Sequence, residues 1–445
     1  MSGHGDRRVK MRALESRDAV ASFAEVALGY SRDEAMAEAR RADGADLSRA
    51  AAACPFGVDV PGLVRLVAAG AFEDAHALIL KVHAWPGILG RYCHRPCEAA
   101  PALAAGREPI FISALERAAS EHGIAGRTPF RAGPASGKCV AIVGAGSAAA
   151  AAAYRLRQRG HAVSMFEQLP IAGGMTAIGY PDFRLPLAVV QRENALAEWG
   201  VDANFEVEID RAFIGRLLSD FDAVIVGTGK FKCQRLDIPG EELEGVWDAL
   251  DLLTRVKLGR PAPIGAKVVV LGAGYSAQDS SRTARRMGAE VTIYYRRRKE
   301  DMPVNQTQLA RYMGRQADEG APYVLQVAPV RILGAGGKVA GVELVRTAPG
   351  PVDETGRPAP VPVPGSAFTV ACDTVIAAVG EVCDLSHLPA AVDITATGHV
   401  RVDPATFATT LPGLYAVGEM TGAKGTENAF KTGLLCADAL DRALK

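Results

Sequence analysis

The residues best suited to redox or metal chemistry are three cysteines in the first hundred residues. Cys93 and Cys97 are separated by three residues in GRYCHRPCEAAP, and Cys54 directly precedes a proline. Thiolates are the usual ligands of iron–sulfur clusters, whereas a buried thiol without metal behaves as a small hydrophobic side chain. The pattern leaves two interpretations open, a metal site or structural thiols.

A glycine-rich loop follows a short apolar stretch in VAIVGAGSAAAAAAYRLRQRGHAVSMFE. Gly144 allows a tight turn, Gly146 lets the backbone approach a pyrophosphate, and Ala149 keeps the next helix close to the strand. The N-terminus of that helix offers amides to phosphates. The second apolar stretch ends in Glu167, at the spacing of an acid that binds ribose hydroxyls. The motif predicts a dinucleotide site; the alternative is a tight turn in an unrelated α/β protein.

The same pattern recurs in AKVVVLGAGYSAQDSSRTARRMGAEVTIYYRRRKEDMP, with Gly272, Gly274 and Ala277 in the equivalent positions. Here the second apolar stretch ends in Tyr295 and the three arginines 296–298 instead of an acid. A guanidinium binds a 2′-phosphate through paired hydrogen bonds, and a carboxylate would repel it. The arginines favour NADP(H) over NAD(H); the alternative is a solvated basic surface at a strand end.

Both loops need a parallel sheet to present them, and the sequence predicts one. Short β-branched stretches alternate with helical segments after residue 138: CVAIVG, AVSMFE, FDAVIVGTG, KVVVLGAG, EVTIYYRR, TVIAAVG and GLYAVGE. This alternation is typical of α/β folds. Residues 1–125 instead show apolar spacings of three and four, and DVPGLVRLVAAG begins with an Asp cap and a proline, so a helical region is expected there.

Composition narrows the class of protein. The 445 residues are too many for one typical core, and 50 basic residues balance 50 acidic ones, so nothing suggests binding to nucleic acid or an acidic membrane. The polar N-terminus MSGHGDRRVK shows no signal peptide, and no apolar run is long enough for a membrane span. Eight scattered cysteines without an export signal favour a reducing, cytoplasmic location.

These motifs together resemble flavoproteins with two dinucleotide-binding domains, and most sharply the small subunit of bacterial glutamate synthase and its relatives. The relatives include the N-terminal half of dihydropyrimidine dehydrogenase and the large subunit of NADH-dependent ferredoxin:NADP oxidoreductase. The resemblance covers nearly the whole chain. It is carried by both glycine loops and by AGGMTAIGYPDFRLP, FDAVIVGTG, LDIPGEELEGV, TVIAAVG, TLPGLYAVGEMTG, FAEVALGYSRDEAMAEARR and EPIFISALERAA.

The resemblance implies an α/β fold with two Rossmann-like dinucleotide-binding domains, in which the NAD(P) domain is inserted in the FAD domain. An α-helical iron–sulfur-type domain precedes them. The expected bounds are 1–136 for the helical domain, 137–254 and 376–445 for the two parts of the FAD domain, and 255–375 for the NAD(P) domain.

The resemblance also implies which residues hold the nucleotides. The FAD residues would be Gly144, Gly146, Ser147, Ala149, Glu167, Gly173, Gly174, Met175, Arg184, Thr228, Gly229, Gly418, Glu419, Thr426, Glu427 and Asn428. The NAD(P) residues would be Gly272, Gly274, Tyr275, Ser276, Arg296 and Arg297, and Gly380 lies in the second hinge. Glu419 stands where the family has aspartate, and Tyr275-Ser276 stand where it has Asn-Thr.

In these relatives the helical domain binds two [4Fe–4S] clusters. Here the cysteines expected before Cys54 are missing, and Pro101 takes the place of the last one. The positions of the flavin-proximal cluster are all able to bind iron: Cys54, Cys93, Cys97 and Glu116, which aligns with a Gln or Glu ligand of the relatives. We therefore expect one cluster; the alternative is a degenerate domain with buried thiols.

The expected function is that of an FAD-containing electron-transfer subunit. It would exchange hydride with NAD(P)(H) and, through the cluster, single electrons with a partner. The second nucleotide domain has no nearby Cys-x-x-Cys for a dithiol relay. The expected partner is an iron–sulfur or metal-cofactor subunit, as in a tungsten-containing aldehyde oxidoreductase. The alternatives are a glutamate synthase small subunit supplying NADPH electrons, a stand-alone NAD(P)H:acceptor reductase, and a non-catalytic FAD scaffold.

Overall fold

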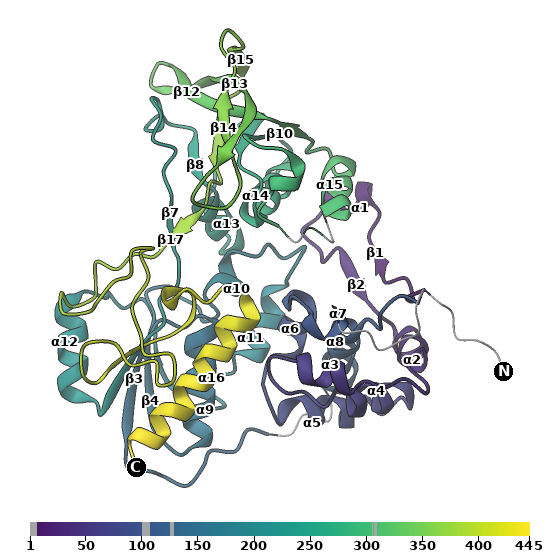
Figure 1. Cartoon of the computed structure of the whole chain (residues 1–445), viewed down its shortest axis with the longest axis vertical. Coiled ribbons are helices and arrows are strands. Elements are labelled where there is room, and N and C mark those ends of the chain that lie inside the picture. Colours follow the sequence, from purple (N-terminus) through teal and green to yellow (C-terminus); the bar gives the residue numbers. More distant parts are fainter. Residues whose placement is uncertain (1–6, 100–106, 125–128, 305, 307–308) are drawn as a thin grey trace.

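The computed structural model describes residues 7–99, 107–124, 129–304, 306 and 309–445. A helical region lies beside one five-stranded parallel sheet, and a second such sheet lies above both (Figure 1). Pro101, the expected site of a lost cysteine, is outside the described residues. Among the residues that are described, no helix is both long and apolar enough to cross a membrane.

The helical region begins with a small sheet that its helical periodicity did not predict. β1 (Arg12–Ala13) and β2 (Ala27–Gly29) pair antiparallel on either side of α1 (Ser16–Val20). Strands this short depend on their pairing partner, so local pattern does not mark them. The helices follow as α2 (Arg32–Arg40), α3 (Ser48–Ala53), α4 (Val60–Ala68), α5 (Phe72–Leu80), α6 (Pro86–Tyr92), α7 (Pro96–Ala99) and α8 (Ile112–Gly123). As predicted, Asp59 caps α4, and its side chain accepts a 2.9 Å hydrogen bond from the Gly62 amide.

The first parallel sheet has the strand order β18–β6–β3–β4–β5. Its strands are β3 (Cys139–Val143), β4 (Ala162–Phe166), β5 (Asp202–Asn204), β6 (Ala223–Val226) and β18 (Leu414–Ala416). Helices α9 (Ser147–Gln158) and α16 (Thr426–Ala443) pack together on one face, and α12 (Arg211–Asp220) covers the other. This is the doubly wound arrangement expected for a dinucleotide domain.

The second parallel sheet has the order β11–β10–β9–β16–β8. Its strands are β8 (Val246–Asp248), β9 (Lys267–Leu271), β10 (Glu290–Tyr295), β11 (Tyr323–Leu325) and β16 (Thr374–Ala377), with helices α13 (Ala249–Lys257), α14 (Tyr275–Arg286) and α15 (Leu309–Asp318). An antiparallel extension adds β12 (Val327–Ala335), β13 (Lys338–Val352), β14 (Pro358–Pro362) and β15 (Phe368–Ala371).

An antiparallel ribbon of β7 (Lys232–Cys233) and β17 (Glu381–Val382) connects the two sheets (Figure 1). It lies outside both, so the chain leaves the first sheet before residue 232 and returns after residue 382. The expected boundary after residue 254 needs correction, because β8 pairs with β16 in the second sheet and α13 packs on α14. The expected boundary at 375/376 also falls inside β16.

The helical region is held firmly against the first sheet. Trp85 stacks on Phe430 of α16 with ring centroids 4.3 Å apart. Glu193, at the end of α11 (Leu187–Glu193), accepts hydrogen bonds of 2.6 and 2.9 Å from the amides of Gly87 and Ile88 at the start of α6. These buried contacts fix the position of the cysteine segment 93–97, which directly follows α6.

Candidate functional site

The first glycine loop joins β3 to α9. Gly144 has φ 94°, and a Cβ added there would lie 2.7 Å from the carbonyl oxygen of Gly227, so only glycine fits. A Cβ on Gly174 would lie 2.7 Å from Cα of Gly146, so the two loops approach at backbone contact. α9 begins after Gly146 with no side-chain cap, which leaves its first amides available to an anion.

Glu167 directly follows β4, as predicted, and holds this loop. Its Oε2 accepts a 2.7 Å hydrogen bond from the Ala145 amide, and its Oε1 accepts a 2.8 Å bond from the Leu169 amide. The side chain is buried, and burial raises the pKa of the carboxyl against these two hydrogen bonds. The remaining lone pairs of the carboxylate can accept from a ribose hydroxyl.

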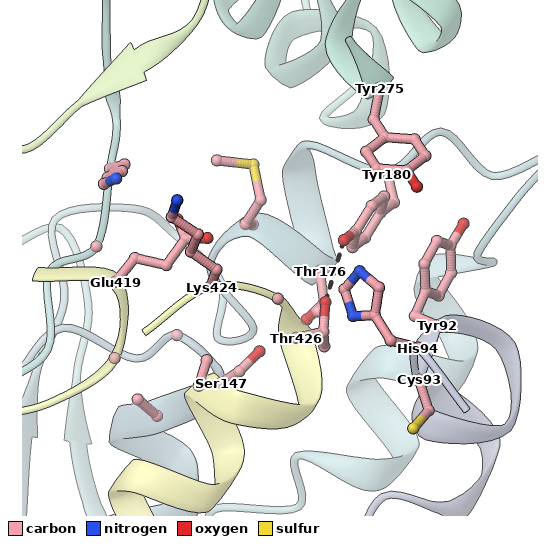
Figure 2. A pocket seen from close by; sticks show the side chains of 18 of the residues that line it. Tyr92, Cys93, His94, Ser147, Thr176, Tyr180, Tyr275, Glu419, Lys424 and Thr426 are labelled. Carbon is pink, nitrogen blue, oxygen red and sulfur yellow. Dashed lines mark hydrogen bonds between the residues drawn. The ribbon is translucent and has the colours of Figure 1, made fainter. Parts of the chain in front are cut away.

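Two adjoining cavities, of about 390 and 360 Å³, run along the loop. They share Gly146, Gly227, Gly229 and Phe231 and form one elongated space. Figure 2 shows the larger of the two, called the flavin-side cavity below, where α16 begins at Thr426. The predicted FAD residues that line the space are Gly144, Gly146, Ser147, Glu167, Gly174, Met175, Arg184, Thr228, Gly229, Gly418, Glu419 and Thr426. The shape and the glycine walls fit an elongated dinucleotide.

The other predicted FAD residues support the space or lie outside it. Ala149 is a fully buried residue of α9 itself, and Gly173 forms a backbone bridge to Gly146. Glu427 is buried, and its Oε1 lies 2.6 Å from Nδ1 of His94, a hydrogen bond that raises the pKa of His94. Asn428 is exposed and donates to the Lys424 carbonyl. Neither Glu427 nor Asn428 lines the cavity.

Several lining residues were not predicted from the sequence. Tyr92 stacks on Tyr180 with centroids 4.1 Å apart, and the guanidinium of Arg184 lies 5.1 and 5.6 Å from the two ring centroids. Tyr180 also makes a 3.1 Å hydrogen bond to Thr426 (Figure 2). At the other end, Asp384, Ser386 and His387 line the same cavity as Glu167. These residues lie far apart in the chain, so no local sequence pattern could have predicted that they line one space.

The second glycine loop repeats the geometry of the first. Gly272 has φ 140°, and α14 begins after Gly274 with no side-chain cap. A Cβ on Gly274 would meet nothing nearer than Pro303 at 3.8 Å, which leaves room for a ligand. Tyr275 extends from α14 into the flavin-side cavity (Figure 2). Ser276 instead donates a 2.5 Å hydrogen bond to Glu381 of the ribbon.

The arginines after β10 divide into different roles. Arg297 is buried; it donates to the Pro358 carbonyl over 2.9 Å and forms an ion pair with Asp353 of the antiparallel extension. Arg298 is paired with Asp301 at 2.9 Å. Arg296 is exposed, and burial of its inner part together with the charge of Arg297 lowers its pKa. The geometry therefore offers Arg296, and not Arg297, to a phosphate. The carbonyl of Gly380, the hinge glycine, accepts a 2.8 Å hydrogen bond from the amide of Gln234, which directly follows β7.

The four predicted iron ligands lie around a single pocket in the helical region. Cys54, Cys93, Cys97 and Glu116 all line it, although they come from three separate segments, with Cys93 and Cys97 on the same one. Burial raises the pKa of each thiol, to about 12 for Cys97, and the Glu116 carboxylate raises all three further. Without a metal, therefore, the thiols are protonated at neutral pH; iron would reverse this.

The pocket also contains polar atoms that the protein leaves unsatisfied. Oε1 of Glu116 and Nε2 of His83 are buried and lie 3.3 Å apart, and neither makes a hydrogen bond of good geometry. Over the described residues, no three His, Cys, Asp or Glu side chains gather closely enough for a single metal ion. A [4Fe–4S] cluster makes a different demand, because each ligand binds a different iron and the ligands stand apart. Three thiols and a carboxylate around one pocket are a donor set that fits such a cluster.

Comparison with known families assigns both the helical region and the region with the two parallel sheets. Residues 138–433 match the family model of pyridine nucleotide-disulphide oxidoreductases. Residues 19–127 match the model described as dihydropyrimidine dehydrogenase domain II, 4Fe-4S cluster. The chain belongs to the pyridine nucleotide-disulphide oxidoreductase family. It is an oxidoreductase with FAD and NAD(P) as cofactors, and its N-terminal domain is of the [4Fe–4S] type.

Relatives within this oxidoreductase family confirm the resemblance to glutamate synthase small chains. The NADPH glutamate synthase small chain of Azospirillum brasilense is 33% identical over 427 residues, which cover 89% of this chain and 86% of that protein. The NADP(+)-dependent formate dehydrogenase subunit beta of Moorella thermoacetica is 35% identical over 423 residues, 88% of this chain and 59% of that protein. The NADPH-Fe(3+) oxidoreductase subunit beta of Geobacter sulfurreducens is 36% identical over 360 residues, 77% of this chain and 52% of that protein. The chain thus spans little more than half the length of the last two.

Solved structures agree on the fold. FprA of Mycobacterium tuberculosis in complex with NADPH aligns with a TM-score of 0.56 at 20% identity, over 69% of this chain and 85% of that one. A 2-naphthoyl-CoA reductase aligns with a TM-score of 0.53 at 18% identity, over 84% of this chain and 51% of that one. At such identities the likeness establishes the arrangement of the domains and nothing more specific.

Proposed function

We propose that the chain is the FAD-containing electron-transfer subunit of a multisubunit oxidoreductase. It exchanges hydride with NAD(P)(H) and single electrons, through one [4Fe–4S] cluster, with a partner subunit. Cys54, Cys93, Cys97 and Glu116 are the proposed iron ligands, and the elongated cavity beside the first glycine loop is the proposed FAD site.

One observation carries this proposal: Cys93 and Arg95 line both the flavin-side cavity and the cysteine pocket. The two sites therefore share a wall. Tyr92, next to Cys93, stacks on Tyr180 inside the flavin-side cavity. The family fold and the glycine loops account for hydride exchange alone. Electron transfer between flavin and cluster also needs the two sites to be adjacent, and a shared wall makes them so.

The electron count requires an acceptor or donor beyond the chain. A hydride carries two electrons, and a flavin can hold both, whereas a [4Fe–4S] cluster passes one at a time. Each NAD(P)H oxidised therefore sends two successive electrons to the partner, and NAD(P)⁺ reduction takes two from it.

The partner class is the finer part of the proposal. Two relatives are named beta subunits, of a formate dehydrogenase and of an Fe(3+) oxidoreductase, which supports a metal-cofactor or iron–sulfur partner such as an aldehyde oxidoreductase subunit. The second candidate is a glutamate synthase small subunit, favoured by the 86% coverage of the Azospirillum protein. The names of all three relatives specify NADP or NADPH, which together with exposed Arg296 supports NADP(H).

The first test is iron, sulfide and FAD per chain in anaerobically purified protein, followed by mixing with NADPH and then NADH. We expect about four irons per FAD and flavin bleaching by NADPH. Iron near zero with bleaching would indicate a reductase without a cluster. Absence of bleaching with both nucleotides would indicate a non-catalytic scaffold. Co-purification with an amidotransferase-type large subunit would favour the glutamate synthase candidate.

A further inference from the structure

His83 lines the same pocket as Cys54, Cys93, Cys97 and Glu116. Its side chain is only 1% exposed and its ring packs against Phe56, with centroids 4.8 Å apart. The backbone amide of Trp85 donates a 3.2 Å hydrogen bond to its Nδ1. Ring orientation is therefore set from two sides.

The hydrogen bond from Trp85 also determines which ring nitrogen carries the proton. Because Nδ1 accepts from an amide, the neutral imidazole has its proton on Nε2. That atom lies 3.3 Å from Oε1 of Glu116, and both atoms are buried without a hydrogen-bond partner of adequate geometry. Buried donors and acceptors in native proteins are almost always satisfied. A small movement of either side chain would bring Nε2 and Oε1 into a hydrogen bond.

A protonated Nε2 has no lone pair for iron, so His83 is a donor and not a ligand. We propose that His83 is a positioning residue for the cluster: its Nε2–H donates to one carboxylate oxygen of Glu116 and leaves the other oxygen for iron. The inference rests on the proposed function, in which Glu116 is the non-cysteine ligand. Outer hydrogen bonds of this kind orient a metal ligand and adjust its electron donation.

The direction of the effect follows from charge. A hydrogen bond to a ligand withdraws negative charge and favours the more negative, reduced cluster, so it raises the reduction potential. Loss of the donor should lower that potential. Loss of a buried imidazole elsewhere in the helical region should not.

The experiment compares the full-length, cluster-loaded wild type with His83→Leu, His83→Gln, Glu116→Gln and the double variant His83→Leu/Glu116→Gln. His76→Leu is the matched control, since His76 is equally buried in the same region but does not line the cysteine pocket. Iron and FAD per chain are measured first. The cluster potential and its EPR spectrum are then followed in a redox titration, which needs no turnover.

We expect His83→Leu to disfavour cluster reduction about tenfold, a shift of about 59 mV for one electron, and His83→Gln to restore most of it through its amide donor. In the Glu116→Gln background the His83→Leu change should have a clearly smaller effect, since the two residues act together. An unchanged potential and spectrum in His83→Leu with full iron would overturn the proposal and leave the proposed function standing. Iron lost from both His83 variants while FAD is retained would also overturn it, because His83 would then only support the pocket. A wild type without iron would overturn the proposed function itself and this inference with it.

Discussion

The two glycine-loop units of this chain share their local geometry and differ in what surrounds them. Gly144 and Gly272 both have positive φ, and α9 and α14 both begin without a side-chain cap. After the second strand, however, one unit has Glu167, which holds its own loop, and the other has the arginines 296–298. In the proposed function the same loop geometry serves two nucleotides, because the residues after the next strand differ in charge.

The helices that follow the loops also differ in how they are anchored. On α9, Arg155 and Arg159 lie 4.0 and 2.8 Å from Asp438 of α16, at the surface. On α14, Arg282 and Arg286 each lie 2.8 Å from Glu319, which is fully buried. A buried ion pair costs far more to break than an exposed one. The second unit therefore depends on a charged network where the first depends mainly on apolar packing.

The largest expected effect separates the two loops by cofactor. Gly144→Ala places a Cβ 2.7 Å from the Gly227 carbonyl oxygen, and Gly272→Ala places one 2.1 Å from that of Ala378, both at positive φ. Each should cost roughly 1–3 kcal/mol or more. We expect Gly144→Ala to lose FAD, and Gly272→Ala to keep FAD and lose NAD(P)H reactivity. FAD absorbance per chain and nucleotide titration distinguish the two; equal loss of FAD would show that the loops are not independent.

A second expected effect tests the anchors through pH. Burial alone would raise the pKa of Glu319, but hydrogen bonds and charges from Arg282 and Arg286 outweigh it and lower the pKa to about 2. A lowered carboxyl pKa stabilises the fold above the unfolded value, near pH 4.5, and this contribution is lost as pH falls toward 2.

We therefore expect Glu319→Gln to lower the unfolding free energy by about 3 kcal/mol at pH 7, with a difference from wild type that shrinks between about pH 5 and pH 2. Asp438→Asn should cost less than about 1 kcal/mol. Denaturant unfolding across this pH range measures both; a pH-independent Glu319→Gln difference would contradict the ionic account.

The smallest expected effect tests the arginines. Arg296→Ser should weaken NADPH binding about tenfold and leave NADH unchanged, since a lost phosphate contact is worth roughly 1–2 kcal/mol. Arg297→Ser is the matched control: because Arg297 binds Asp353 and the Pro358 carbonyl, it should lower stability and affect both nucleotides alike. The measurement is the ratio of the dissociation constants for NADPH and NADH. An unchanged ratio in Arg296→Ser would show that Arg296 does not bind the 2′-phosphate.

Much of the fold and part of the site were predictable from local sequence. The strands β3, β4, β9 and β10 lie where short apolar runs predicted them, and Glu167 follows its strand as expected. Turn geometry, helix caps and apolar periodicity depend on residues close together in the chain, so a single sequence is enough to predict them. The placement of β8 in the second sheet was missed, because parallel pairing joins β8 to β16 across more than a hundred residues.

The sequence by itself determined the two glycine loops, the acid and the arginines that follow them, and the set of thiols able to bind iron. Only the tertiary structure decided that Arg297 forms an ion pair with Asp353. It also decided that Tyr92 stacks on Tyr180 and that His83 lies beside Glu116. The reason is physical: local motifs are set by backbone conformation within a few residues. The shared wall between the two proposed cofactor sites exists only after distant helices pack and bury the same side chains.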